Sequence, residues 1–295
     1  MSKLSIVTRA LEKYQDYKDE PIREAIATLS ETFKETARLT DERLSAEVVT
    51  PDWSRETIES ALKGEKPLIA ACSLDLTETM VRETAQGIAK TIIQAHQEDA
   101  ELQAQYAAYD WSSVINASAL ALIKTAPEAW LGQLEATFET PLEQGVIYPS
   151  CLYALRVLFS PYAREVSEAF RHFYQKDDTL HFDRTLKCPF CGGEPIFAHV
   201  AQTTSHGNEK SLVCSTCLTK WPFERIRCAV CGESATSELS YVHDEADTAH
   251  RLHTCGHCGS AFPTAFQNNI SAFSPDIESL IMLGLEAAYL DQRNA

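Results

Sequence analysis

The sequence predicts a mainly α protein: an N-terminal all-α helical domain, two tandem small β modules built around metal ions, and a C-terminal helix. Three observations predict this order. Apolar residues recur at helical spacing through residues 1–183. Eight of the ten cysteines and six of the 11 glycines lie between Cys188 and Gly259. Helical spacing returns after residue 274. The expected boundaries are 1–183, 184–224, 225–265 and 266–295.

The helical part is expected to be a bundle of six to eight helices. Pro21 suits a first helical position, and apolar residues follow it at helical spacing. A second helix is predicted over 52–62, behind a capping candidate. The run 77–109 predicts one long helix, or two helices broken near Gly87.

Three further helical segments complete this part. Residues 114–124 and 127–138 predict shorter helices, and Pro127 begins the second. Residues 146–176 are apolar and aromatic, but Pro149 and Pro161 interrupt them. Because proline lacks an N–H and clashes inside a helix, we expect a helix, a break and another helix there.

The composition changes from Arg184 onward. Short β-branched or aromatic segments between turns predict strands at 196–200, 211–214, 223–228 and 239–243. At the end of the chain, Ser274 can cap a helix and Asp276 suits the positive end of its dipole. We expect a closing helix over 275–290 that docks on one of the two domains.

Four Cys-x-x-Cys pairs lie in the region of small strands. The first and second pairs are 22 residues apart, the third and fourth 23, but the second and third only 10. The first two pairs recur as the last two with offsets of 40 and 41 residues, which indicates an internal duplication. We expect two four-thiolate sites, one of Cys188, Cys191, Cys214 and Cys217, the other of Cys228, Cys231, Cys255 and Cys258.

This spacing suits a metal ion. Two residues between thiols let both sulfurs face one ion while the backbone turns around it. Glycine, which accepts positive φ, follows three of the four pairs, whereas Leu218 follows the second, so that pair must turn otherwise. Tetrahedral sulfur-only sites select Zn²⁺ or mononuclear iron. Each copy of roughly 30 residues is too small to fold on an apolar core, so the ion is its core.

The other reactive residues are interpreted mainly as structural. Cys72 and Cys151 are expected to be buried small apolar residues. His253 and His257 lie in or beside the fourth pair, where they either tune the thiolates by hydrogen bonding or are inert loop histidines. Thiol–disulfide exchange would need a βαβ thioredoxin context, which the sequence lacks.

Composition excludes several classes of function. The net charge of −16, from 26 basic and 42 acidic residues, is opposite to that of a nucleic-acid binder. The first 24 residues lack the apolar core of a secretory signal, and no apolar stretch reaches the ~20 residues of a membrane span. The helical part shows no nucleotide loop, Ser/His/Asp order or HExxH. We therefore expect a cytoplasmic protein without membrane insertion, and no enzyme.

These motifs together resemble the formate dehydrogenase accessory proteins of the FdhE type. The resemblance is sharp over about 188–285 and architectural over 1–183. The residues that carry it are Cys188-Pro-Phe-Cys191-Gly192, Cys214-Ser-Thr-Cys217-Leu-Thr-Lys-Trp221, Arg225-Ile-Arg-Cys228-Ala-Val-Cys231-Gly232, His253-Thr-Cys255-Gly-His-Cys258 and Asp276-Ile-Glu-Ser-Leu280.

The resemblance implies a cytoplasmic maturation factor for formate dehydrogenase. It implies two rubredoxin-like modules that hold iron, and a partner in the catalytic subunit of that enzyme, which is bound before export. We thus expect two metal ions per chain, with iron favoured by the resemblance and zinc, in zinc-ribbon-like modules, as the alternative. Monomer and homodimer stay open. The alternative functions are a rubredoxin-like iron electron carrier or oxidoreductase, and a zinc-ribbon nucleic-acid-associated protein.

Overall fold

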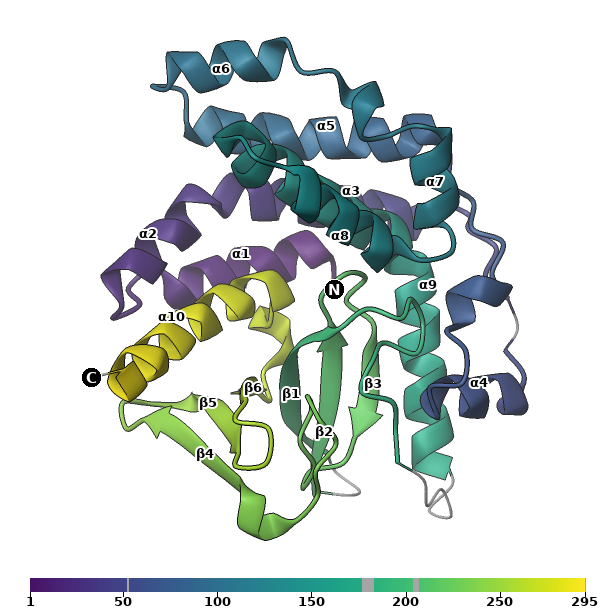
Figure 1. Ribbon diagram of the computed structural model, residues 1–295, viewed down its shortest axis with the longest axis vertical. Helices are drawn as coiled ribbons and strands as arrows, with labels where there is room; N and C mark the ends of the chain where they lie inside the picture. Colours follow the sequence, from purple (N-terminus) through teal and green to yellow (C-terminus); the bar gives the residue numbers. More distant parts are fainter. Residues whose placement is uncertain (52, 177–182, 204–206, 295) are drawn as a thin grey trace.

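The computed structural model describes residues 1–51, 53–176, 183–203 and 207–294, with helices above a small sheet in the view of Figure 1. The described helices that precede the sheet are α1 (Lys3–Tyr14), α2 (Glu20–Thr28), α3 (Ser30–Ser45), α4 (Arg55–Leu62), α5 (Glu78–Ala95), α6 (Ala100–Ala107), α7 (Ala117–Ile123), α8 (Pro127–Thr137) and α9 (Tyr148–Lys176). The predicted all-α first part is confirmed, with nine α-helices in the described ranges instead of six to eight.

The break predicted inside residues 77–109 lies in a different place. Gly87 is within α5, and the chain leaves the helix at His96 instead. Asp99 then caps α6, its side chain accepting a hydrogen bond from the N–H of Leu102. A capping side chain therefore sets this boundary, because a single glycine costs a helix only about 1 kcal/mol.

The break predicted at Pro161 is wrong, because α9 runs through that residue. Proline leaves the carbonyl of Val157 without its helical donor. The hydroxyl of Ser160 donates to that carbonyl at 2.7 Å and replaces the missing bond. Pro149 lies at the junction between α9 and the π-helical turn η3 (Glu143–Ile147). The expected helix, break and helix is thus one long helix against which the first part packs.

The helix predicted over 52–62 starts later than expected. Ser54 caps α4 by accepting a hydrogen bond from the N–H of Thr57, and Asp52 lies outside the described residues.

Six strands form one sheet below the helices (Figure 1). Their order is β3-β2-β1-β6-β5-β4, and neighbours are antiparallel except β1 and β6, which are parallel. The strands are β1 (Pro195–Thr203), β2 (Gly207–Cys214), β3 (Lys220–Phe223), β4 (Leu239–Asp244), β5 (Asp247–Cys255) and β6 (Ala261–Phe266). Each copy of the duplication contributes three strands in the same spatial order, so the two copies join head to tail in a continuous sheet.

The strand predictions are partly right. Strands lie at 196–200, 211–214 and 239–243 as expected, each within a longer strand. The strand predicted at 223–228 is wrong: β3 ends at Phe223, and the following residues form a loop that leads to Cys228. The polar residues of β5 and the proline within β6 hid those two strands from the sequence pattern.

The final helix, α10 (Pro275–Asn294), contacts both parts of the chain instead of one. Ile277 and Ile281 pack into a cluster with Val7 and Ala10 of α1. Beside these residues on α10, Glu278 accepts a hydrogen bond from His250 of β5 at 2.7 Å. This helix therefore fixes the second module against the N-terminal helices. Within the described ranges, no helix is both long enough and apolar enough to cross a lipid bilayer.

Candidate metal centres

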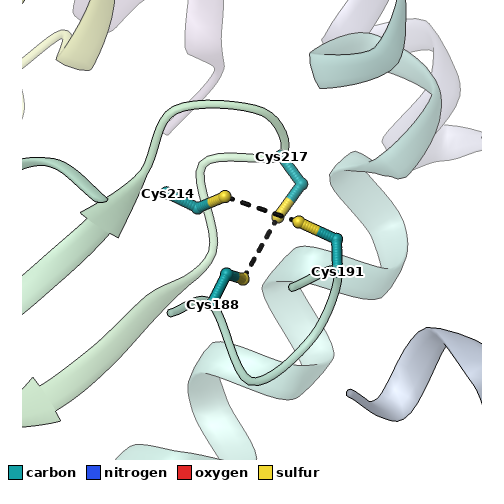
Figure 2. Close-up of side chains that lie close together, drawn as sticks. All are labelled: Cys188, Cys191, Cys214 and Cys217. Atoms are coloured by element: carbon teal, nitrogen blue, oxygen red, sulfur yellow. Dashed lines mark hydrogen bonds between the residues drawn. The ribbon is translucent and has the colours of Figure 1, made fainter. Parts of the chain in front are cut away.

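The structure brings all eight cysteines of the four pairs together in the two expected sets of four. Within each set, the four sulfurs lie within 4.8 Å of one another. In the first cluster the sulfurs of Cys188 and Cys217 are 3.7 Å apart, and those of Cys191 and Cys214 are 3.5 Å apart. Figure 2 shows the four side chains converging from two loops on one point.

These distances fit a tetrahedral ion. Sulfurs placed 2.3 Å from a central metal stand about 3.8 Å from one another. In the second cluster Cys228 to Cys258 and Cys231 to Cys255 are both 3.8 Å. A disulfide would need about 2.05 Å, and all ten cysteines are free. The donor set therefore fits Zn²⁺ or mononuclear iron equally well.

All four Cys-x-x-Cys loops share one backbone turn. In each loop the N–H of the residue after the second cysteine donates to the carbonyl of the first cysteine. In each, too, the N–H of the first cysteine donates to a carbonyl five residues later. The residue after the second cysteine has positive φ in every loop, including Leu218 at 59°. The second loop therefore turns as the others do, with a leucine in a conformation that favours glycine.

The helical domain holds the first cluster from two sides. The short 3₁₀ turn η1 (Leu68–Ala71) donates the N–H groups of Leu68 and Ile69 to the carbonyls of Pro189 and Phe190 in the first loop. Arg156 of α9 donates twice to the carbonyl of Ser215 in the second loop, at 3.0 and 2.6 Å. The two loops of the first cluster are thereby fixed to helical segments that precede them by 121 residues (Leu68 to Pro189) and by 59 residues (Arg156 to Ser215).

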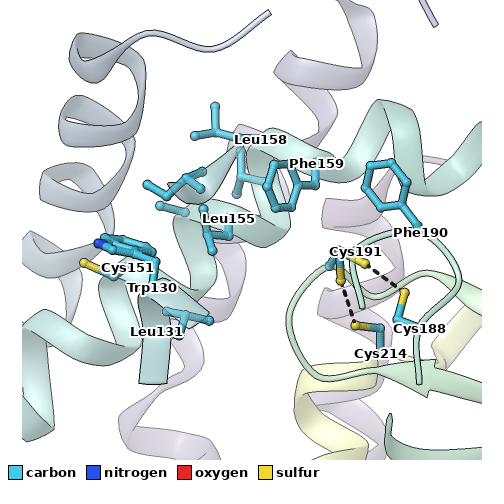
Figure 3. Close-up of a cluster of buried hydrophobic side chains, with 14 of the residues drawn as sticks. Trp130, Leu131, Cys151, Leu155, Leu158, Phe159, Cys188, Phe190, Cys191 and Cys214 are labelled. Carbon is cyan, nitrogen blue, oxygen red and sulfur yellow. Dashed lines mark hydrogen bonds between the residues drawn. The ribbon is translucent and has the colours of Figure 1, made fainter. Parts of the chain in front are cut away.

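The first cluster is also part of the main hydrophobic core. Phe190, between its two cysteines, packs edge-on against Phe159 of α9 and stacks on Tyr162. Figure 3 shows this core running from Trp130 through Leu155 to the cysteines. All four sulfur-bearing residues of the first cluster are at most 4% exposed. An ion there is shielded from water and from other proteins.

The second cluster is open to solvent. Cys231 and Cys258 are exposed, whereas Cys228 and Cys255 are buried. In the described part of the chain, no helix covers its loops in the way that η1 and α9 cover the first pair. The duplication has therefore produced two sites of equal chemistry and unequal access.

The shifted thiol pKa values indicate that four thiolates at this spacing need a cation between them. Burial, followed by the sulfurs of Cys214 and Cys217, raises the pKa of Cys188 well above its usual value. In the second cluster, burial opposes ionisation of Cys228, but backbone N–H groups outweigh it and lower the pKa of that thiol. Four thiolates cannot coexist so close without a cation, and a central ion removes that repulsion.

The other cysteines and histidines singled out from the sequence are not members of the two ligand sets. Cys151 is fully buried in the helical core and Cys72 is half-buried, so burial raises the pKa of both thiols. His257 is exposed and lies 3.8 Å from Glu233. Among the described residues, no side-chain hydrogen bond joins His253 or His257 to a sulfur, although the backbone N–H of His257 donates to the sulfur of Cys255. His257 therefore fits the interpretation as an inert loop histidine, whereas His253 lies within strand β5.

Arg156 is a residue that the sequence pattern does not reveal. It is 6% exposed, and besides Ser215 it pairs with Asp276 at the start of α10. It lies in an ordinary helical pattern, and its partners are 59 and 120 residues away. No local signal could have identified it.

Comparison with known proteins agrees with this geometry. Residues 187–225 match the family model "FdhE, central domain". The "Protein FdhE homolog" of Pectobacterium atrosepticum is 34% identical over 99 residues, or 32% of this chain and 31% of that protein. The homolog of Aquifex aeolicus is 29% identical over 100 residues, or 34% of this chain and 35% of that protein. The chain thus matches about a third of the length of these curated relatives.

The fold extends the likeness beyond the matched segment. The crystal structure of the FdhE protein from Pseudomonas aeruginosa superposes with a TM-score of 0.52 at 17% identity. That superposition covers 98% of this chain and 92% of the other, so the helical part and the sheet share one fold. The family model and the curated relatives thus show that the cysteine-rich segment is similar to FdhE proteins, and the solved structure shows that the chain shares their fold.

Proposed function

We propose that this protein is a cytoplasmic accessory factor that binds the catalytic subunit of formate dehydrogenase and supports its assembly. The observation that carries the proposal is the pair of four-cysteine clusters within an FdhE-type fold. A helical body that buries one cluster and exposes the other suits a protein that holds a partner instead of turning over a substrate.

In this proposal Cys188, Cys191, Cys214 and Cys217 hold one ion, and Cys228, Cys231, Cys255 and Cys258 hold the other. The first ion joins the two loops to which η1 and Arg156 donate hydrogen bonds, so it has a structural role. The second ion lies at the surface, where an incoming partner reaches it. Iron is the metal we propose, on the family resemblance, and elemental analysis distinguishes it from zinc. The units 1–183, 184–224, 225–265 and 266–295 remain our proposed division.

The test is complementation in a bacterium that lacks its own accessory protein. The unaltered chain should restore formate dehydrogenase activity, and the double variant C231S/C258S should not, although the first cluster keeps that variant folded. The double variant C72S/C151S is the control, because it removes two thiols outside both clusters. Full restoration by C231S/C258S, at equal protein level, would contradict the proposal.

Exposure of Cys231 and Cys258 also favours a second candidate function, that of an iron electron carrier. An iron ion ligated there would be close enough to the surface to exchange electrons with another protein. Reversible bleaching of a visible band by a physiological reductant, coupled to turnover of an acceptor, would favour this function over assembly.

A further inference from the structure

The strongest unassigned feature is a pocket of about 420 Å³ lined by residues of both modules, most of them from the second. Its volume falls within the range of small-molecule sites, roughly 300–1,000 Å³. It lies on the sheet face turned away from α10 and its neighbouring turn. His199 and His250 face that side, against Phe273 and Glu278. Val200 pairs with Lys210 on one side and with Phe266 on the other, so these three side chains share a face. Since Val200 follows His199 along the strand, that face is the opposite one.

The lining of this pocket is cationic in an acidic protein. It contains Lys210, Arg225, Arg227 and Arg251, and no aspartate or glutamate is among its lining residues; Cys228 and Cys255 of the second cluster also line it. The chain as a whole has 42 acidic and 26 basic residues. Like charges gathered in one concave site repel one another, so a cluster of this kind favours a bound anion.

The basic side chains of the pocket differ in whether a carboxylate of the protein pairs with them. Arg227 pairs with Glu224 at 3.2 Å, and Glu224 is shared with Arg184. For Arg225 and Arg251, the described residues offer no carboxylate within ion-pair distance. Three positive charges, on Lys210, Arg225 and Arg251, are thus left facing the pocket without a paired carboxylate.

Lys210 lies deepest. It is 4% exposed, and its ammonium group donates one hydrogen bond, to the carbonyl of Arg227 at 3.2 Å. Its other N–H donors find no acceptor among the residues that the structure describes. A buried ammonium with free donors is costly unless a ligand or water accepts them.

Aromatic side chains complete the site. Arg251 is held between Phe266 and Tyr241, at 4.3 and 4.9 Å from the two ring centres. Stacking fixes the plane of this guanidinium, which prepares it to bind two oxygens of one anion. The rim includes Ile226 and Tyr241, which are 58% and 53% exposed. An apolar rim beside fixed cations suits an anionic group attached to a flat organic ring.

We propose that this pocket binds a small phosphorylated organic molecule, with its phosphate on Lys210, Arg225 and Arg251 and its ring against the aromatic rim. A phosphate monoester carries about −1.5 to −2 charge, which matches several cations better than one carboxylate does. The convergence of cations from two strands and a loop onto one concave site favours a small ligand over an extended acidic peptide. The proposal stands apart from the assembly role and does not depend on it.

The test is calorimetric titration of the full-length, metal-loaded protein at low salt with adenosine monophosphate and with pyrophosphate. We expect saturable binding with a dissociation constant below about 1 mM. The double variant R225Q/R251Q and the single variant K210M should each weaken binding about tenfold or more. The control R9Q/R38Q removes two exposed helical arginines outside the pocket and should leave binding within about twofold.

Three outcomes would overturn the proposal. The first is that the unaltered protein binds neither probe and R225Q/R251Q loses metal, which would show that the cations only offset the charge of the second cluster. The second is that the control weakens binding as much as the pocket variants do. The third is that a hexaglutamate peptide binds in the pocket and both phosphates fail, which would identify a peptide-docking surface. If R225Q/R251Q misfolds, the single variant R225Q, at an exposed residue without an ion-pair partner, decides between these results.

Discussion

At the scale of single residues, the left-handed position after each cysteine pair determines how the metal loops turn. Glycine occupies it three times, and the sequence alone predicts those turns. Leu218 takes the same conformation, at φ 59°, and the sequence gives no sign of it. Its side chain packs against the cluster that contains Phe197 and Phe273, and this packing offsets the strained backbone.

The same substitution should have opposite effects at two glycines. Gly259 has φ 73°, and a Cβ there would meet no heavy atom within 4 Å, so G259A adds only backbone strain. We expect a loss of about 1 kcal/mol in unfolding free energy. Gly87 is helical and equally uncrowded, so G87A should gain about 0.5–1 kcal/mol. Urea unfolding followed by circular dichroism checks both, and shifts of the same sign would contradict the assigned conformations.

Access to the sulfurs differs residue by residue, which predicts an order of modification. Under native conditions, chelator and iodoacetamide together should alkylate Cys231 and Cys258 before any cysteine of the first cluster. Exposed thiols react first because reagent and chelator reach them without unfolding of the chain. Peptide mass mapping over time measures the order, and fully buried Cys151 is the internal control. Early labelling of Cys188 or Cys214 would mean that the first cluster opens as readily as the second.

At the scale of elements, a few long-range polar contacts join helices to sheet. Arg156 links α9 to the second cysteine loop and to the start of α10. His250 of β5 lies between Asp247 and Glu278, at 2.7 Å from each, and Tyr14 of α1 donates to Glu278 at 2.9 Å. These contacts fix the orientation of elements that are distant in sequence.

Removing the Arg156 side-chain charge should be costly. R156M leaves Asp276 and the carbonyl of Ser215 without their partner in a buried setting, and we expect a loss of about 3 kcal/mol. R164M, on the same helix at a residue with a 48% exposed side chain, should change stability by no more than about 0.5 kcal/mol. Chemical unfolding of both variants provides the comparison. Equal effects would show that Arg156 does not join the elements.

The His250 contact predicts a dependence of stability on pH. Burial would lower the pKa of His250, but hydrogen bonds to Asp247 and Glu278 outweigh it and raise the pKa to about 9. Lys13 also faces Glu278 with its charge, and Tyr14 faces it as a neutral hydroxyl donor. Because the folded pKa exceeds the unfolded value near 6.5, the stabilisation is full below pH 6.5 and is lost as pH rises through 9.

The corresponding experiment compares the unaltered chain with H250Q between pH 6 and about 10. The unaltered chain should lose up to roughly 3 kcal/mol more than H250Q over this range. The difference between the two proteins isolates His250 from other groups that titrate there. Parallel stability curves would show that the histidine is not charged in the folded protein.

A helix or strand could be predicted from the sequence where its own residues determine it, and not where distant residues do. Helical spacing and proline positions located most helices, and the cysteine spacing located both clusters. The continuity of α9 was not predicted because the Ser160 hydroxyl replaces the backbone hydrogen bond that Pro161 removes. Strands β5 and β6 were not predicted because their partners in the sheet, and not their own residues, stabilise them. The break between α5 and α6 followed a cap instead of the glycine.

At the scale of the whole molecule, duplication and docking have separated two equivalent sites. The two copies form one sheet in which β1 of the first lies parallel to β6 of the second. The helical body then covers the first copy and leaves the loops of the second at the surface. Sequence symmetry predicted two identical centres, and only the packing of distant helices makes them differ. That difference is the basis for assigning support to one centre and partner contact to the other.

The most direct test of this account is metal content and X-ray absorption of the anaerobically purified full-length protein. We predict two ions per chain, each with four sulfurs at about 2.3 Å. The variant C231S/C258S should keep one ion and its fold. One ion or none per unaltered chain, or a coordination shell dominated by oxygen and nitrogen, would contradict it.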